Sequence, residues 1–548
     1  MSGADPGAGI PYERALAAWR AFPEDGPAPL LDATTASEVL RAFHPDFQDE
    51  TTTRLRVGPS AGARCPRGLA ALLEANAVVQ DVDIAGAPVL EADVLVLGGG
   101  GAGTVAALEA ARLGARVLVA SKLRIGDGNT VMAEGGIQAA VGADDSLQRH
   151  FDDTWRGGGF RGDPELVKTL VAEGPAVIRW LIQEGMSFDL EEGTERLGGR
   201  LRRARPGGAT AARLLSFRDL TGLELMRVLR EALLLQPGID VLEAHAGLEL
   251  LTDEEGRCAG AVLFDLEGGQ LRLVRAASTI LATGGAGRLH LEGSPTSNHF
   301  GATADGLVLA YRAGVPLRDV DSFQYHPTGL AWPQHLEGAL ISEAARTAGA
   351  RLRNGHGHRF VEELAPRDVV ASAILRELDE GRGVRRDGAH GVLLDTPELE
   401  QRHPGILEKH LVTLSHLAAR AGVDPRAEPL LVRPTLHYQN GGAAIDTNGA
   451  TCVAGLWCAG ELAGGIHGRN RLMGNALLEL VVFGRRAGHE AAAGATARPR
   501  SAGLTHLAAW ERGLMGAGLS LDVRAPIVFS PQANFDVAAQ LDRQRRRP

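Results

Sequence analysis

The sequence predicts an α/β fold, and three observations support that class. Residues 94–121 show the pattern of a strand, a glycine-rich turn, a helix and a second strand, the order found in dinucleotide-binding units. Two later apolar runs, at 278–281 and 455–458, end in small residues, as strands do where they meet a flat ligand. Glycine makes up 71 of the 548 residues, about 13% against an average of about 7%. Tight turns and close approaches of the backbone to a ligand are therefore expected.

The first unit begins with the β-forming run Val94-Leu95-Val96-Leu97 and continues into a helical pattern over 104–113 and a strand-like run over 116–121. Between them lies G-x-G-x-x-G, with Gly98, Gly100 and Gly103. The first glycine permits the turn, the second lets the backbone approach a pyrophosphate, and the third lets helix and strand pack closely. Ser121 and Lys122 stand where an acid usually ends the second strand, so a hydroxyl is expected to hold the ribose.

The two ends of the chain carry no motif that indicates a function. In the N-terminal segment 1–90, one helix is predicted over 69–79, and the rest is expected to wrap the main body. The tail after about residue 488 is rich in alanine, and a helix is predicted over 504–515.

Composition excludes several classes of protein. The chain has 57 basic and 67 acidic residues and a net charge of −10, which argues against a nucleic-acid partner. The arginine-rich stretch 196–205 is interpreted as a solvated loop rather than a phosphate patch. The four cysteines form no C-x-x-C pair, so no metal, zinc or iron–sulfur site is expected in the chain itself. No apolar run approaches the roughly 20 residues of a membrane span, and without a visible secretory signal a cytoplasmic location is expected.

Eight blocks, spread in order over residues 91–490, carry a resemblance to a known family. They are Gly98 to Gly103, Ala133-Glu134-Gly135-Gly136, Asp219-x-Thr221-Gly222, Ala282 to Gly285, Gln324 to Gly329, Pro366-Arg367-Asp368, Arg433 to Tyr438 and His467 to Leu472. The chain resembles the flavoprotein subunits of succinate dehydrogenase and fumarate reductase, and their close relative L-aspartate oxidase.

This resemblance implies a Rossmann-type FAD-binding domain that is interrupted by an α+β capping domain, with a dicarboxylate bound between the two. The expected boundaries are an N-terminal extension of unknown role at 1–90, FAD-binding parts at 91–319 and 431–490, a capping domain at 320–430, and a short helical tail at 491–548. The implied cofactor-binding residues are Gly98, Gly100, Gly101, Ala102, Gly103, Ser121, Lys122, Thr130, Gly135, Gly136, Ala282, Thr283, Gly284, Asp305, Glu461, Asn475 and Leu477.

The same resemblance assigns the chemistry, in which a hydride moves between flavin N5 and a dicarboxylate carbon while a proton moves at the neighbouring carbon. The implied substrate-binding residues are His326, Thr328, Ser342, His437 and Arg471. Arg367 is the implied proton donor or acceptor, recharged through Glu343 and Arg346. The last two are three residues apart, so on a helix they would share one face.

Three departures from the family pattern affect these expectations. Asn129 replaces the histidine that links covalently to FAD in membrane-bound relatives, so non-covalent FAD is expected. The segment Arg346-Thr347-Ala348-Gly349 departs from the family's Arg-Gly-Glu-Gly, which puts that loop in doubt. Arg469 adds a cation that either faces solvent, the favoured interpretation, or enlarges the positive field.

Three functions remain open at this point. The first is an enzyme of the fumarate reductase or succinate dehydrogenase type. It would exchange electrons with an iron–sulfur or other electron-transfer subunit, or with a small carrier. A partner subunit could also hold it at the inner face of a membrane. The second is L-aspartate oxidase, in which Asp152 is either the acid that meets the substrate ammonium or a solvated helix residue. The third is a non-catalytic flavin-binding electron-transfer subunit. The first is the one predicted.

Overall fold

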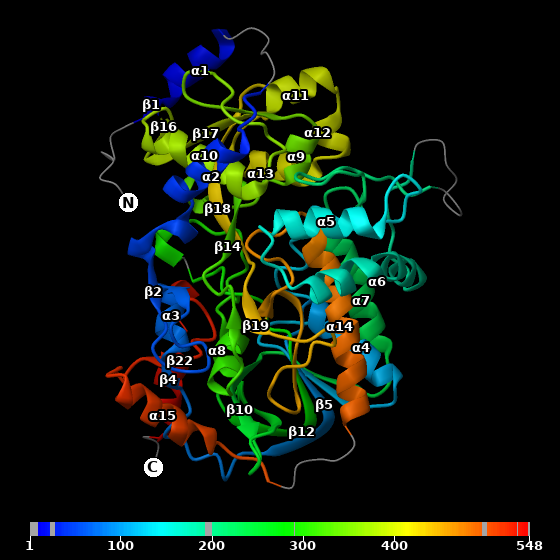
Figure 1. The fold of residues 1–548 in the computed structure, drawn as a ribbon, viewed down its shortest axis with the longest axis vertical. Coiled ribbons are helices and arrows are strands. Elements are labelled where there is room, and N and C mark those ends of the chain that lie inside the picture. The colour runs from blue at the N-terminus through cyan, green and yellow to red at the C-terminus, as the bar shows by residue number, and fades with distance from the viewer. Residues whose placement is uncertain are drawn as a thin grey trace.

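Two sheets organise the chain in the computed structural model, which describes residues 9–21, 28–191, 200–289, 291–495, 501–533 and 535–545. One sheet has seven strands and the other has six; in Figure 1 the first lies in the lower half of the molecule and the second in the upper half. Within the part of the chain that is described, every helix is too short or too polar to span a bilayer.

The seven-stranded sheet has a parallel part that begins with the predicted β–turn–α–β unit. Its strands are β5 (Val89–Leu97), β6 (Val117–Ala120), β9 (Ile239–Leu242), β10 (His245–Thr252), β11 (Cys258–Asp265), β12 (Leu271–Leu281) and β20 (Leu456–Cys458). The order is β10-β11-β12-β5-β6-β9, with β20 beside β12; β9, β6, β5, β12 and β20 are parallel, whereas β10 and β11 form an antiparallel meander.

Helices cover both faces of this sheet, so its strands are apolar on both sides. The helices around this sheet are α3 (Arg67–Leu73), α4 (Gly101–Arg112), α5 (Leu147–Gly157), α6 (Pro164–Gln183), α7 (Thr221–Leu235), α8 (Asp305–Arg312) and α14 (Asn475–Gly494). Val94 and Val96 face a core shared with α4, α7 and α14, whereas Leu95 and Leu97 face a core shared with α3 and α8.

The six-stranded sheet and its helices enclose a separate apolar core between residues 330 and 432. Its strands are β1 (Ile10–Pro11), β14 (Phe323–Leu330), β15 (Arg351–Arg353), β16 (Val384–Arg386), β17 (Ala389–Asp395) and β18 (Leu430–Gln439). The helices of this half are α9 (Glu343–Thr347), α10 (Arg367–Asp379), α11 (Thr396–Arg402), α12 (Ile406–Lys409) and α13 (Val412–Ala421). Five small strands form two further ladders, in which β7 (Ile137–Gln138) pairs with β8 (Leu214–Leu215), and β19 (Gly442–Ala444) pairs with both β13 (Leu317–Arg318) and β21 (Ala463–Gly464).

The N-terminal segment lies along both halves. Its first strand, β1, pairs with β16, and α1 (Tyr12–Ala21) packs on the same sheet, whereas α2 (Ala33–Phe43) packs on α10. The chain then descends through β2 (Thr52–Arg54), β3 (Arg64–Pro66) and α3 to the lower half. The helix predicted over 69–79 ends at Leu73, because the chain becomes extended and forms strand β4 (Asn76–Ala77).

That strand pairs with the tail of the chain. β4 lies parallel to β22 (Arg524–Ala525), and the indole of Trp510 in α15 (His506–Gly516) donates to the Ala75 carbonyl at 2.9 Å. A last helix, α16, spans Val537–Arg545. The predicted tail helix is therefore present, but it is accompanied by a strand and by contacts to the N-terminal segment.

Candidate functional site

A cavity of about 900 Å³ lies between the two halves of the molecule. One part is lined by the residues that follow β5, β6 and β12, at the carboxyl ends of parallel strands, where ligands bind in open α/β sheets. The other part is lined by side chains from β14, β18 and the first turns of α9 and α10. This arrangement fits an elongated ligand that contacts both halves.

The glycine-rich turn has the geometry that a dinucleotide site requires. Gly98 has φ +119°, and a Cβ added there would lie 2.2 Å from the Ala282 carbonyl oxygen. A Cβ added to Gly103 would lie 1.9 Å from the Gly98 carbonyl, so only glycine lets α4 begin this close to the strand. A Cβ added to Gly100 would meet nothing nearer than 3.8 Å, which leaves its backbone open to a ligand.

Most of the predicted cofactor-binding residues line this cavity. Those that do are Gly98, Gly100, Gly101, Ala102, Ser121, Lys122, Thr130, Gly135, Gly136, Ala282, Thr283, Gly284, Asp305, Glu461 and Leu477. Gly103 lies behind the turn and serves packing. Asn475 also lies outside the lining, because its side chain hydrogen-bonds His150 and Thr154, each at 3.0 Å.

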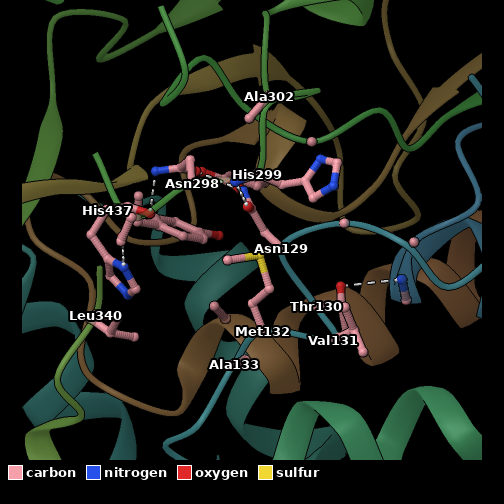
Figure 2. Close-up of a pocket in the computed structure, with 18 of the residues that line it drawn as sticks. Asn129, Thr130, Val131, Met132, Ala133, Asn298, His299, Ala302, Leu340 and His437 are labelled. Carbon is pink, nitrogen blue, oxygen red and sulfur yellow. Dashed lines mark hydrogen bonds between the residues drawn. The ribbon is translucent and has the colours of Figure 1, made fainter. Parts of the chain in front are cut away.

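The wall around Asn129 is a connected polar network, which Figure 2 shows with its partners. The Asn129 amide nitrogen donates to Asn298 Oδ1 at 2.7 Å, and its oxygen accepts from the His299 backbone N–H at 2.8 Å. The same amide lies 3.4 Å from Glu461, and burial raises the pKa of that carboxyl to about 7. The Thr283 hydroxyl is buried in the lining without a partner among the described residues. Open glycines and a free hydroxyl fit a polar cofactor such as FAD.

A buried ion cluster closes the other part of the cavity. The Arg367 Nε donates to Glu343 Oε2 at 2.7 Å, and Arg346 Nη2 donates to the same oxygen at 3.3 Å. Ser342 caps α9, which places Glu343 in its first turn, and Arg346 follows one turn later. Burial alone would raise the pKa of Glu343, but the two guanidinium groups lower it to about 2. Glu343 is therefore ionised, and it contacts Arg346 on one face of α9, as the i,i+3 spacing suggested. Arg346 lies behind Arg367, outside the lining.

Gln324 joins two arginines. It belongs to the family block Gln324 to Gly329, but the sequence indicated no role for it. Its Oε1 accepts from Arg367 Nη1 at 3.0 Å and from Arg471 Nη2 at 2.9 Å. Its amide nitrogen donates to Asn470 Oδ1 at 2.7 Å and to the Arg471 carbonyl at 2.6 Å. The Arg471 guanidinium also stacks over the Tyr438 ring at 4.4 Å. Burial and the nearby Arg367 lower the pKa of Arg471 to about 10.

Two histidines complete this part of the wall. The rings of His326 and His437 lie 5.2 Å apart, and His437 Nδ1 hydrogen-bonds Ser297 at 2.8 Å. Burial and the neighbouring guanidinium of Arg367 hold the pKa of both histidines well below the usual value, so both are neutral. Thr328 does not line the cavity, because its hydroxyl donates to the Ile341 carbonyl at 2.8 Å and lies 3.3 Å from His326 Nδ1.

The structure bears on the interpretations of Asp152, of Arg469 and of the stretch 196–205. Asp152 lies outside the cavity lining and accepts from Gln148 at 2.9 Å, so the solvated-helix alternative describes its place. Arg469 does not simply face solvent, because its guanidinium donates to Asp321 at 3.0 Å and 3.2 Å, which neutralises its charge. Within the stretch 196–205, residues 196–199 lie outside the described residues, and Arg203 pairs with Asp144 at 2.5 Å.

Comparisons with known proteins identify the family to which the chain belongs. The family model of the FAD-binding domain matches residues 93–477. The chain is 41% identical over 420 residues to a fumarate reductase (CoM/CoB) subunit of Methanothermobacter marburgensis, covering 75% of this chain and 74% of that protein. It is 40% identical over 423 residues to L-aspartate oxidase of Streptomyces coelicolor, covering 74% and 70%.

A solved structure of E. coli quinol fumarate reductase matches with a TM-score of 0.70 and 33% identity, and the match covers 78% of this chain and 74% of that one. This confirms the predicted α/β flavoprotein fold. The chain is a FAD-dependent oxidoreductase, and it belongs to the family of fumarate reductase and succinate dehydrogenase flavoprotein subunits, with L-aspartate oxidase as a close relative.

Proposed function

We propose that this chain interconverts fumarate and succinate, or a similar four-carbon dicarboxylate, with FAD held non-covalently. The observation that carries the proposal is the buried Arg367–Glu343–Arg346 cluster at the wall of the cavity, beside Arg471 and two neutral histidines. A site for an uncharged ligand has no need of this concentration of positive charge, whereas a dianion does.

The residues of the lower half are proposed to hold the cofactor. The backbone at Gly98 to Gly101 and the beginning of α4 face the pyrophosphate, and Ser121, Lys122 and Asp305 face the adenosine ribose. When bound, FAD exchanges a hydride with one carbon of the substrate. Asn129 has an amide where a covalent link needs a nucleophilic imidazole, and that amide is engaged with Asn298 and His299, which supports a non-covalent cofactor.

The upper half is proposed to hold the substrate. Arg471 offers a planar pair of donors that suits a carboxylate, and Gln324 fixes its orientation relative to Arg367. His326, His437 and Ser342 supply neutral hydrogen-bonding groups on the same wall. Because neither histidine carries a charge, the arginines supply the field that binds the dianion and polarises its double bond.

Arg367 is proposed to move the proton. An arginine in water is a poor acid because its pKa exceeds about 12. Here Arg367 is buried in the cavity wall, where Glu343 and Gln324 hold its guanidinium in one orientation, so its N–H groups are fixed at the place where the substrate is proposed to bind. Glu343 contacts both Arg367 and Arg346, so a proton can pass between the two arginines through its carboxylate.

Electrons are proposed to arrive from an iron–sulfur or other electron-transfer subunit, or from a small carrier. The related fumarate reductase and succinate dehydrogenase proteins are named as subunits. The four cysteines, at positions 65, 258, 452 and 458, are free, and the described residues contain no group of three or more His, Cys, Asp or Glu side chains that could hold a metal ion. An iron–sulfur cluster is usually held by four neighbouring thiolates. A membrane association would then come from the partner.

L-aspartate oxidase is the second candidate, favoured by the 40% identity to the Streptomyces enzyme. Asp152 does not line the cavity, but Glu134 and Asp219 do, and a carboxylate there could meet a substrate ammonium. Burial and the nearby Asp219 hold the pKa of Glu134 well above its usual value, which leaves it neutral and weakens this alternative.

A paired assay of the purified holoprotein tests the proposal. One anaerobic cuvette contains viologen reduced by dithionite, together with fumarate; the other contains L-aspartate in air with peroxide detection. Fumarate turnover without aspartate oxidation is expected. Aspartate-dependent peroxide would favour the oxidase, and silence in both cuvettes with FAD bound would favour a non-catalytic subunit or another substrate.

A further inference from the structure

The C-terminal tail reaches a residue of the cavity wall. Lys122 lines the cavity, and its ammonium donates to Thr303 Oγ1 at 2.9 Å, Asp305 Oδ2 at 2.5 Å and the backbone carbonyl of Val528 at 2.6 Å. An ammonium has three protons to donate, so the tail supplies the third acceptor. The Thr303 hydroxyl also lies 3.0 Å from the Val528 carbonyl.

We propose that residues 526–530 form a latch on the adenosine half of bound FAD. By holding Lys122 and its partner Asp305 in place, this latch slows release of the cofactor. The adenosine half is implicated because the residues that end the second strand of a β–α–β unit contact the ribose. The proposal rests on FAD binding at this cavity, as proposed above.

The latch is anchored on both sides. Upstream, β22 pairs with β4, and Arg312 Nη2 donates to the Ala525 carbonyl at 3.0 Å. Downstream, the ring of Phe529 lies 5.5 Å from that of Phe300 and 5.4 Å from that of Phe535. Residues 526–530 lie outside the segment 93–477 that matches the family model of the FAD-binding domain.

The backbone conformation of Val528 aims its carbonyl at Lys122. Val528 has φ +67° and is fully buried. A β-branched residue rarely adopts this conformation, and it persists only where the surrounding structure holds it. Proline cannot adopt it, because its ring fixes φ near −65°, whereas glycine adopts it without cost. The pair Val528→Pro and Val528→Gly therefore separates loss of the latch geometry from loss of the side chain.

The first test measures FAD release from each holoprotein by the recovery of flavin fluorescence after dilution. Losing a hydrogen bond to a charged group predicts that Val528→Pro releases FAD at least about tenfold faster than the parent. A chain that ends after Ala525 keeps β22 and should behave in the same way. Val528→Gly should stay within about twofold. Circular dichroism and unfolding of the apoproteins check that each variant folds.

The second test uses the unchanged chain and needs no variant. Hydrogen exchange of the apoprotein is followed with ADP, with FMN and without ligand. ADP should slow exchange at 527–530, and FMN should not. Release rates within twofold for Val528→Pro and the shortened chain, or equal exchange at 527–530 with and without ADP, would overturn the latch. A parent chain that binds neither FAD nor ADP would instead overturn the proposed function.

Discussion

Arg367 donates its Nε hydrogen to Oε2 of Glu343 across 2.7 Å, and both side chains are buried at the wall of the cavity. The remaining side of the guanidinium faces Gln324. This places a fixed cation where a dicarboxylate would bind, with an ionised acid behind it.

Arg367→Ala should strongly slow dicarboxylate turnover while FAD remains bound. A positioned proton donor contributes typically 10²–10⁴-fold to a rate, so kcat should fall by about this factor. Steady-state assays with reduced viologen and fumarate measure it. The control is Arg426→Ala, in an exposed pair with Glu408. If the Arg367 variant kept nearly full activity, the assignment of the proton donor would be wrong.

Glu343→Gln should lower the stability of the folded protein and also slow dicarboxylate turnover. Removing one partner of a buried ion pair costs about 3–5 kcal/mol, because Arg346 and Arg367 would lose their shared counter-charge. The control Glu408→Gln changes an exposed pair and should cost about 1 kcal/mol or less. Unfolding in urea measures both free energies.

The same carboxylate gives a pH dependence whose sign follows from its lowered pKa of about 2. Because the pKa is below that of the unfolded chain, the contribution to stability is present above about pH 4.5 and is lost as the pH falls toward 2. The parent should lose more stability than Glu343→Gln over this interval. If the unfolding free energies of the parent and of Glu343→Gln changed equally with pH, the lowered pKa would not belong to Glu343.

Gln324→Leu should lower the catalytic efficiency, kcat/KM, because Arg367 and Arg471 would lose the side-chain oxygen to which both donate. Hydrogen bonds to charged groups contribute about 1.5–3 kcal/mol, so kcat/KM should fall about 10- to 100-fold. Gln334→Ala, at an exposed position, is the control. An unchanged kcat/KM would show that the two arginines hold their places without Gln324.

Glu461 should make the stability of the apoprotein fall as pH rises. Burial raises its pKa to about 7, so the folded state keeps a proton that the unfolded state loses above about pH 4.5. The stabilising contribution is complete below that value and is lost up to about pH 7. Glu461→Gln should flatten the curve. Urea unfolding of both apoproteins at pH 5 and pH 7.5 measures the difference.

Acid precipitation tests the flavin linkage that Asn129 implies. Acid should unfold the chain and leave the yellow colour in the supernatant, since an amide forms no bond to the flavin ring. A coloured pellet after washing would contradict a non-covalent cofactor.

Local patterns in the sequence were sufficient for the first β–turn–α–β unit of the seven-stranded sheet, β5, α4 and β6. The glycine spacing at Gly98, Gly100 and Gly103 predicted the turn, the helix and the adjoining strand, because each depends on residues within a few positions. The i,i+3 spacing of Glu343 and Arg346 likewise predicted their contact. The helix over 69–79 was overestimated because pairing of β4 with β22, far along the chain, determines where it ends.

By itself, the sequence determined the α/β class, the dinucleotide unit and the family, since each depends on short segments of neighbouring residues that occur in a fixed order. Only the tertiary structure decided which side chains meet. Gln324 joins arginines 43 and 147 positions away, and Val528 reaches Lys122 across 406. Such contacts arise from the packing of two sheets and two termini, and no periodicity in the chain encodes them.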